Sequence, residues 1–385
     1  MRSWRGLALM LTLLLCGAAT AVPSAMATSI AAPRRLVAGN ALYPRLVRLE
    51  HSGTAENGRI VSSVVSFAGG THAAILQSSD DGASFEQIGS INDPMAGSGE
   101  CCGTMLELPA ALGNLPAGTL LWAGSFGHDK GPGMAVRVWA SRDDGRNWSY
   151  LSECAANRGR AGLWEPALAL AAEGRLACYF GDESQNPVHS QVIAMTTSAD
   201  GIHWSKRSTV VATGRSGERP GMPVVRRLPG GRYFMSYENC NVPHYFCGGY
   251  ERFSPDGIHW KNPAAYGTAI RTADGHYFQH AQTVALLPGG PHGTRIVSIG
   301  QIYVDAKGHP APGNGNMILV NDDLGAGPWH PEPAPLPVPR PYDNPCPNYS
   351  SALLATHGGH ALLESATTFA SNGSCRAYYA SSPVS

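Results

Sequence analysis

Short apolar runs alternate with turns along most of the chain, and few segments show the hydrophobic periodicity of a helix. The runs 43–49, 136–140 and 233–238 are rich in β-branched or aromatic residues, and each is bounded by glycine, proline or polar residues. Runs of this length and composition, separated by turn residues, are typical of strands. The pattern, with 46 glycines and 29 prolines in the chain, predicts an all-β protein with many tight turns.

A turn motif recurs between these runs. The stretch 141–148 reads Ser-Arg-Asp-Asp-Gly-Arg-Asn-Trp, and 78–85 repeats it with Phe in place of Trp. The stretches 198–204 and 254–260 repeat it with one residue deleted, and a degenerate fifth copy runs over 321–329. The motif aspartates fall at spacings of 63, 57, 56 and 67 residues: Asp80, Asp143, Asp200, Asp256 and Asp323.

The motif has a local physical basis. An Asp followed by Gly favours a tight turn, because glycine tolerates a positive φ and the carboxylate accepts backbone N–H groups. Asp-Gly turns occur in many β proteins, but four copies with a matched Ser and aromatic residue favour a true repeat. The motif resembles the Asp box of the sialidase-like propellers, which implies a structural turn away from the active site.

The repeat length indicates the architecture. A step of about sixty residues is too long for a solenoid rung and suits one four-stranded propeller blade. The length of the chain beyond residue 27, divided by this step, gives six blades. We therefore expect residues 28–385 to form one domain, a six-bladed, sialidase-like β-propeller, with the strand that ends the chain completing a blade with the N-terminal strand.

The N-terminus has the features of a secretory signal peptide over residues 1–27. It begins with Met-Arg-Ser-Trp-Arg, runs apolar over 7–16, and reaches an Ala-Met-Ala exit at 25–27 or an Ala-Thr-Ala exit at 19–21. The apolar run is too short to span a bilayer. We expect a secreted or periplasmic protein that is released and not anchored to a membrane.

Cysteine usage agrees with export. Eight cysteines remain beyond the signal segment: Cys101, Cys102, Cys154, Cys178, Cys240, Cys247, Cys346 and Cys375. An even number in an exported protein indicates disulfides, although sequence does not fix the pairing. The pairs we expect are Cys240–Cys247 and Cys346–Cys375.

The other cysteines are harder to place. We expect Cys101 and Cys102 each to pair elsewhere, and Cys178, inside a strand-like run, to be a buried free thiol. No cysteine pair has C-x-x-C spacing with histidines nearby, so we expect no zinc site, no other metal and no cofactor.

Charge narrows the class of partner. Lys and Arg total 28, Asp and Glu total 28, and charged residues make up only 15% of the chain. A neutral protein of this kind is a poor candidate for binding nucleic acid or a membrane surface. We expect a monomer whose partner is a neutral carbohydrate.

Two glutamates occupy unusual positions. Glu165 stands between Trp164 and Pro166 at the entrance of an apolar strand, and Glu238 ends another apolar strand. A carboxylate there costs free energy unless it is paired or used in chemistry. The structural alternatives are an ion pair of Glu165 with a channel arginine and a solvated Glu238 at a strand end.

Inner strands of a propeller converge on a central channel, so their ends form one pocket. Glu165 and Glu238 come from consecutive predicted blades and would face the same opening, as glycoside hydrolysis by two carboxylates requires. The further residues expected to contact substrate, by stacking or through a guanidinium at the channel, are Arg45, Trp164, Arg219, Tyr237, His280 and Tyr349.

An ordered set of short motifs resembles the exo-1,5-α-L-arabinanase family. These motifs are Tyr43-Pro44-Arg45-Leu46, Trp164-Glu165-Pro166, 178–183 (Cys-Tyr-Phe-Gly-Asp-Glu), 219–222 (Arg-Pro-Gly-Met), 236–238 (Ser-Tyr-Glu) and 348–350 (Asn-Tyr-Ser). The resemblance implies a six-bladed propeller that releases arabinobiose from linear arabinan with retention. It also implies that Glu165 is the acid/base and Glu238 the nucleophile.

Two other functions are compatible with the motif. A sialidase would need three arginines and a Tyr nucleophile partnered by Glu. Arg45 and Arg219 are available, but the segment 178–182 occupies the place of the third arginine. A non-catalytic carbohydrate-binding propeller would need neither glutamate.

Overall fold

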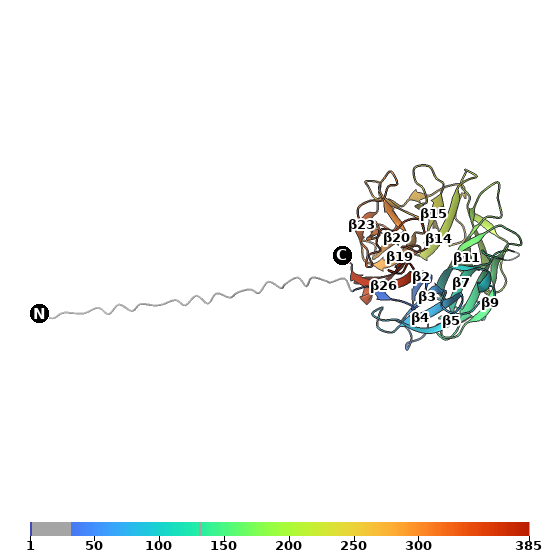
Figure 1. The fold of residues 1–385 in the computed structure, drawn as a ribbon, viewed down its shortest axis with the longest axis horizontal. Coiled ribbons are helices and arrows are strands. Elements are labelled where there is room, and N and C mark those ends of the chain that lie inside the picture. Colours follow the sequence, from blue (N-terminus) through green and yellow to red (C-terminus); the bar gives the residue numbers. More distant parts are fainter. Residues whose placement is uncertain (2–31, 131–132, 385) are drawn as a thin grey trace.

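The computed structural model describes Met1 and residues 32–130 and 133–384. The predicted signal peptide therefore falls, beyond Met1, outside the described residues. The described chain is built from β-strands arranged in six sheets. Figure 1 shows these sheets following one another around a ring in chain order, with the last sheet beside the first. The predicted all-β, six-bladed propeller is confirmed.

Each sheet begins with the strand nearest the axis. The first sheet contains β2 (Ala41–Arg48), β3 (Ile60–Ser66), β4 (His72–Ser78) and β5 (Glu86–Ile91). The second contains β6 (Glu100–Glu107), β7 (Leu120–Phe126), β8 (Ala135–Ser141) and β9 (Ser149–Ala156). The third contains β10 (Leu163–Leu170), β11 (Leu176–Asp182), β12 (Val192–Ser198) and β13 (Ser208–Val211).

The fourth sheet is extended by extra strands. It contains β14 (Arg219–Arg227), β15 (Tyr233–Cys240), β16 (Gly248–Ser254), β17 (Thr268–Ala269), β18 (Tyr277–Gln279) and β21 (Ile302–Val304). The fifth contains β19 (Thr283–Pro288), β20 (Thr294–Ile299), β22 (Met317–Asn321) and β23 (His330–Pro333). The sixth contains β24 (Ala352–Thr356), β25 (Ala361–Phe369), β26 (Cys375–Pro383) and β1 (Arg34–Arg35). Three short 3-10 turns complete the elements: η1 (Ala96–Ser98), η2 (Ala172–Gly174) and η3 (His357–Gly359).

The ring closes through its first and last strands. Around the axis the first strands of neighbouring sheets contact one another, and β24 of the last sheet contacts β2 of the first. At the rim, β1 pairs with β26, with Arg34 opposite Tyr379 and Arg35 opposite Tyr378. As expected, one blade is completed by strands from both ends of the domain.

The repeated motif forms the turn between the third and fourth strands of the first five sheets. In the first copy, the Ser78 hydroxyl donates to Asp80 Oδ1 at 2.8 Å and accepts the Gly82 N–H at 2.8 Å. Gly82 has a φ of +91°, which explains the glycine. In the degenerate copy the side-chain oxygen of Asn321 replaces the hydroxyl and accepts the Gly325 N–H at 2.8 Å. The sixth sheet has no such turn because its fourth strand is the N-terminal β1.

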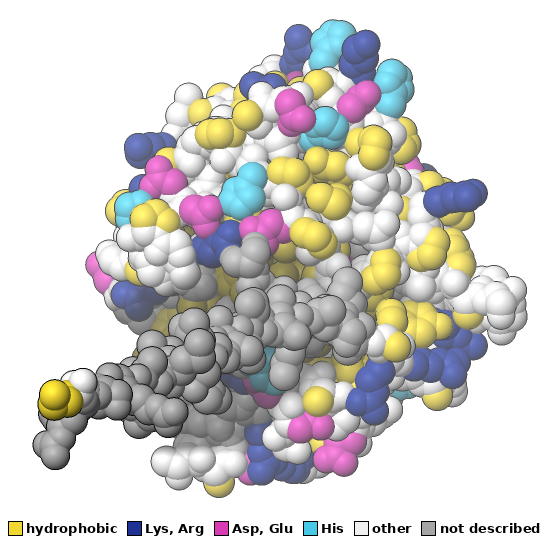
Figure 2. Space-filling view, turned by 90° about the vertical axis from the view of Figure 1, so that its left-hand side faces the viewer, with side chains coloured by type: hydrophobic (Ala, Val, Ile, Leu, Met, Phe, Trp, Pro, Cys, Tyr) yellow, Lys and Arg dark blue, Asp and Glu magenta, His cyan; other side chains and the backbone are white. Residues whose placement is uncertain are grey.

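Neighbouring sheets pack face to face around the ring. One hydrophobic cluster, for example, joins Leu121 and Val136 of the second sheet to Leu168 and Phe180 of the third. Most strands therefore bury both faces, which explains their nearly continuous apolar sequences. The surface shown in Figure 2 mixes acidic, basic, histidine and hydrophobic side chains, consistent with the zero formal charge. The described residues include no helix with the length and apolar character needed to cross a bilayer.

Two predicted disulfides are confirmed and two cysteine predictions are wrong. Cys240–Cys247 and Cys346–Cys375 form as expected. Cys178 is not a free thiol; it bonds Cys154, because β11 and β9 belong to adjacent sheets that share one core. Four disulfides are typical of a protein that folds in an oxidising compartment.

The fourth disulfide joins Cys101 to its neighbour Cys102. The prediction that each pairs elsewhere is wrong, because β6 begins with an irregularity at this point. Its register with β7 shifts between Cys101 and Thr104, and Cys102 has a φ of 63°. Adjacent side chains therefore do not alternate between the faces of the sheet, and their sulfurs can meet.

Candidate active site

The inner strands of the first four sheets start with the same irregularity. Each has a register shift against its neighbour near its first residues. One residue in each shift has a positive φ: Tyr43 (53°), Cys102 (63°), Glu165 (45°) and Met222 (53°). A bulge of this kind re-aims a side chain away from the ordinary pleat. The four irregularities lie at the same end of the ring, and at this end the candidate site is built.

Glu165 is held at the start of β10. Its carboxylate accepts a hydrogen bond from the backbone N–H of Met222, in the corresponding irregularity of the next sheet. Burial raises the pKa of Glu165 to about 8, and the nearby negative charge of Glu238 adds to the rise. The positive charge of Arg219 opposes the rise without cancelling it. The Glu165 carboxyl is therefore poised to carry a proton near neutral pH.

Glu238 lies near the end of β15, paired with Gly221 at the start of β14. Its side chain is 8% exposed, and Oε2 accepts the backbone N–H of Ala281 at 2.6 Å. Burial raises the pKa of Glu238 to about 7, and the hydrogen bond from Ala281 limits the rise. The structure thus brings the two glutamates together from adjacent sheets, each with a backbone N–H donor, and the pKa of Glu238 is raised less than that of Glu165.

Arg219 organises the polar wall beside these carboxyls. Its guanidinium forms an ion pair with Glu183 and donates to Gln191 Oε1 at 2.7 Å and to Ser190 Oγ at 3.0 Å. Arg219 therefore lies at the site, where its contact with substrate stays a prediction, and its charge is engaged by Glu183, which is not among the predicted site residues.

Glu183 also fixes Trp164. Its carboxylate accepts the indole N–H of Trp164 at 3.1 Å and the Gly162 N–H at 2.9 Å. The Trp164 ring lies 5.9 Å from the ring of His128. The sequence pattern could have indicated Glu183, because Asp182 and Glu183 follow the apolar run 176–180 in the same way that Glu238 ends its own apolar strand.

Two tyrosines complete the site. The rings of Tyr43 and Tyr349 meet edge to face with centroids 5.7 Å apart, and the Cys101–Cys102 disulfide packs beside them. Burial raises the pKa of Tyr43 above its usual range, and the charges of Glu165 and Glu238 contribute to the rise. Tyr349 lies at the site, and its contact with substrate stays a prediction; Tyr43 was missed because its strand position alone does not reveal the bulge.

Tyr237 lies in the core between sheets and cannot contact substrate. Its side chain is fully buried, its hydroxyl donates to the Tyr266 carbonyl, and its ring stacks on Tyr250 at 5.7 Å. The predicted contact with substrate is wrong because Tyr237 and Glu238 are consecutive strand residues and point to opposite faces. One packs in the core between sheets and the other faces the site.

The Arg45 guanidinium lies close enough to Tyr43, Arg226 and Glu165 to interact electrostatically with each of them. Its guanidinium donates to the Pro44 carbonyl at 2.7 Å, to the Ser350 carbonyl at 3.0 Å and to Ser350 Oγ at 2.9 Å. The side chain lines the narrow part of the central channel. Arg45 thus supports the site from beneath.

His280 lies on the other side of Glu238. It is 9% exposed, its ring contacts Phe246 edge-on at 5.4 Å, and its Nε2 lies 3.8 Å from a carboxylate oxygen of Asp343. Burial lowers the pKa of His280, and the charge of Asp343 opposes that shift. A neutral imidazole is available there as a hydrogen-bonding group.

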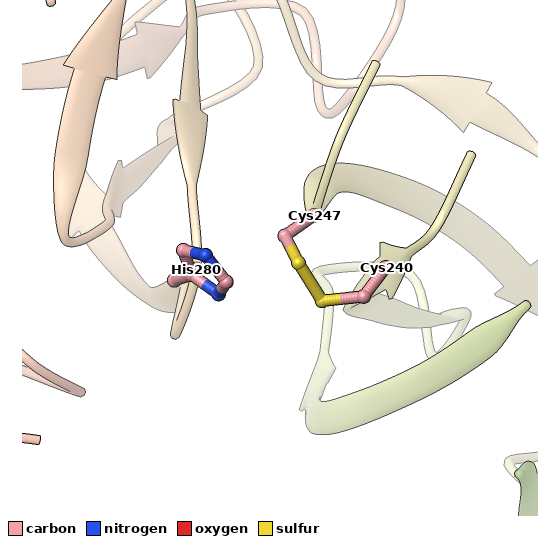
Figure 3. A group of neighbouring side chains, drawn as sticks. All are labelled: Cys240, Cys247 and His280. Carbon is pink, nitrogen blue, oxygen red and sulfur yellow. A yellow bond between two sulfur atoms is a disulfide. The ribbon is translucent and has the colours of Figure 1, made fainter. Parts of the chain in front are cut away.

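His280 also stands beside the Cys240–Cys247 disulfide, as Figure 3 shows. The nitrogen and sulfur atoms of these three residues lie within 4.8 Å of one another, close enough to hold a metal ion. Metal binding requires thiolates, however, and here the sulfurs are bonded to each other. We therefore assign the disulfide to holding the loop at Glu238 and not to a metal centre.

The comparisons with known proteins bear on the fold. No protein-family model matches the sequence, and the search of curated proteins finds no match. The structure is similar to that of the α-L-arabinanase of Penicillium chrysogenum, solved with arabinobiose: the TM-score is 0.74 at 24% identity, covering 90% of this chain and 94% of that one.

Two further solved structures extend the comparison. The GH93 α-L-arabinofuranosidase of Fusarium graminearum, also solved with arabinobiose, gives a TM-score of 0.75 at 22% identity, covering 91% of this chain and 97% of that one. The NanB sialidase of Streptococcus pneumoniae gives 0.58 at 10% identity, covering 90% and 69%. This chain thus has the six-bladed, sialidase-like propeller fold, and it is more similar to the two arabinan-related structures than to that sialidase.

Proposed function

We propose that this protein is a secreted glycoside hydrolase that acts from the chain end on linear arabinan, or on a related neutral glycan, and retains the anomeric configuration. The observation that carries the proposal is the pair of glutamates from adjacent sheets, Glu165 half-buried and Glu238 buried, whose pKa values are raised to about 8 and about 7. The similarity of the whole ring to two proteins solved with arabinobiose supports arabinan as the first substrate to test.

In this mechanism Glu165 is the acid. Its raised pKa keeps the carboxyl protonated near neutral pH, so it can donate its proton to the glycosidic oxygen as the bond to the leaving sugar breaks. In the second step the same carboxylate takes a proton from water as that water attacks the anomeric carbon.

Glu238 is the nucleophile. Its carboxylate is stabilised by the backbone N–H of Ala281 and is ionised at a lower pH than Glu165. It attacks the anomeric carbon from the face opposite the leaving group, forms a glycosyl-enzyme ester, and is released when water replaces it. Two displacements at one carbon give overall retention.

The first alternative, a sialidase, fits the site less well. A sialic acid carboxylate needs a cluster of free arginines, whereas the Arg219 guanidinium is paired with Glu183 and Arg45 points into the channel. The segment 178–182, where the third arginine was sought, is buried strand. The second alternative, a binding module, leaves the raised glutamate pKa values without a role.

The proposal is tested by incubating the disulfide-intact protein with linear arabinan, debranched and branched, and with a fluorogenic sialoside. Product sizing should show a short oligosaccharide, arabinobiose in the first instance, from the earliest time points, and proton NMR should show the retained anomer first. Release of sialic acid, or glycan binding without any product, would replace the proposal by one of the two alternatives.

A further inference from the structure

Below the glutamates the ring narrows to a channel along its axis. Its wall is formed by the inner edge of all six sheets, and its volume is about 50 Å³. A buried water needs about 10–15 Å³ of such space, so the channel has room for a few waters or a small ion. On the far side it widens to a mouth of about 630 Å³ that opens on the opposite face of the ring.

The charges in this narrow channel are all of one sign. Arg45 and Arg226 are the ionisable residues among those that line it. Neither guanidinium forms an ion pair with a carboxylate of residues 32–130 or 133–384. Arg226 donates one hydrogen bond, from Nη1 to the Val225 carbonyl at 3.0 Å. A guanidinium has five N–H donors, so most of those on Arg226 remain for a group in the channel.

Arg226 is exposed to solvent and lines both the narrow channel and its wide mouth. The protein around it lowers the pKa of Arg226 to about 10. Burial lowers the pKa of Arg45 to about 10; repulsion from Arg226 adds to this shift, and the negative charge of Glu165 opposes it. The two guanidiniums repel each other, and an anion between them would relieve that repulsion.

We propose that the channel binds a small inorganic anion of the chloride class between the guanidiniums of Arg45 and Arg226. The anion balances two positive charges that form no ion pair with a carboxylate of the described chain, and it accepts the unused N–H donors. The small volume favours a halide over a sugar acid or an organic phosphate. The wide mouth gives ions a route from solvent that does not pass Glu165 or Glu238.

The test uses the intact protein in sodium gluconate, replaced stepwise by chloride or bromide at constant ionic strength. An anion that binds the folded state raises Tm by mass action, and we expect a rise of about 2–4 °C. Arg226→Gln should abolish the rise. The matched control is Arg227→Gln, which removes the same charge from the next residue of the strand, outside the narrow channel.

Crystals of the wild-type protein soaked in bromide provide a second measurement that does not depend on the variant folding. An anomalous peak between Arg45 and Arg226 is expected. An equal halide response in the wild type and in Arg226→Gln, or a channel without bromide in those crystals, would overturn the assignment.

Discussion

Acidic side chains serve this propeller in two contrasting settings. The turn aspartates, Asp80, Asp143, Asp200 and Asp256, lie near the rim, where hydroxyl and backbone N–H groups donate to them. The hydrogen bond from the Ser84 hydroxyl helps to hold the pKa of Asp80 below its usual value. Around the axis, burial raises the pKa of the paired glutamates, Glu165 and Glu238, to about 8 and about 7.

The contrast separates structure from chemistry. A carboxylate that is repeated in four turns and surrounded by donors is stabilised as an anion, and it holds a hairpin in place. A carboxyl that is buried beside another carboxyl is destabilised as an anion, and it can move a proton. Removing a carboxyl at the axis should therefore abolish activity and leave stability unchanged. Removing a carboxylate at the rim should lower stability and leave activity unchanged.

The largest effect is expected from Glu238→Gln. The change keeps the size of the side chain and removes the nucleophile, so kcat on linear arabinan should fall on the order of 10⁴-fold or more. Circular dichroism and Tm should remain close to wild type. Glu86→Gln, an exposed glutamate on the outermost strand β5, is the matched control and should keep full activity.

A second test of the nucleophile adds azide to the truncated variant Glu238→Ala. Azide can occupy the space left by the carboxylate and attack the anomeric carbon in a single displacement, so the glycosyl azide product should have the inverted configuration. Wild-type activity in Glu238→Gln would remove Glu238 from the mechanism, and a retained azide product would exchange the roles of the two glutamates.

Glu165→Gln should have the next largest effect. General acid catalysis contributes about 10²–10⁴-fold, and the loss should fall in that range on arabinan, whose leaving group needs a proton. An aryl arabinoside with a good leaving group needs none, so its glycosylation step should be almost unchanged. Equal losses on both substrates would indicate that Glu165 has a positioning role and not an acid role.

The pH profile links the two residues. Activity requires Glu238 ionised and Glu165 protonated, so kcat/KM should rise through a pKa of about 7 and fall through a pKa of about 8. Beyond each limb the rate should change about tenfold per pH unit. With the aryl arabinoside, Glu165→Gln should keep the acidic limb and lose the alkaline one. If Glu165→Gln instead lost the acidic limb, the lower of the two pKa values would belong to Glu165.

The fold was largely predictable because its signal is repeated. The motif around Asp143 returns at nearly constant spacing, and its turn is held by local hydrogen bonds that any sheet environment permits. The proximity of Glu165 and Glu238 followed from propeller topology, since Glu165 lies at the start of one strand and Glu238 at the end of another, at the same edge of neighbouring sheets. A periodic pattern and its exceptions were thus enough for the architecture and for the proximity of the two glutamates, whose catalytic roles stay predictions.

The rest of the site was not predictable because it depends on irregular backbone. Alternation does not reveal which of Tyr237 and Glu238 faces the axis when both faces of a blade are buried. The Cys101–Cys102 bond and the placement of Tyr43 arise from bulges with a positive φ, which no residue pattern marked in advance. Glu183 was visible as an acid after an apolar strand, but its partners Trp164 and Arg219 were not.

The smallest effect on activity is expected from Asp143→Ala. In contrast to Glu238→Gln, this change should lower stability and leave activity almost unchanged. Asp143 accepts hydrogen bonds from Ser141 Oγ at 2.8 Å and from the Asn147 N–H at 2.9 Å. Leaving these donors without that acceptor should lower the free energy of unfolding by about 1–3 kcal/mol, measured by urea denaturation. The specific activity of the folded fraction should stay within twofold of wild type, because the turn lies at the rim and the glutamates lie at the axis. A loss of activity in Asp143→Ala without a loss of stability would mean that the rim turns and the axial site are coupled, and the division between the two kinds of acid would then fail.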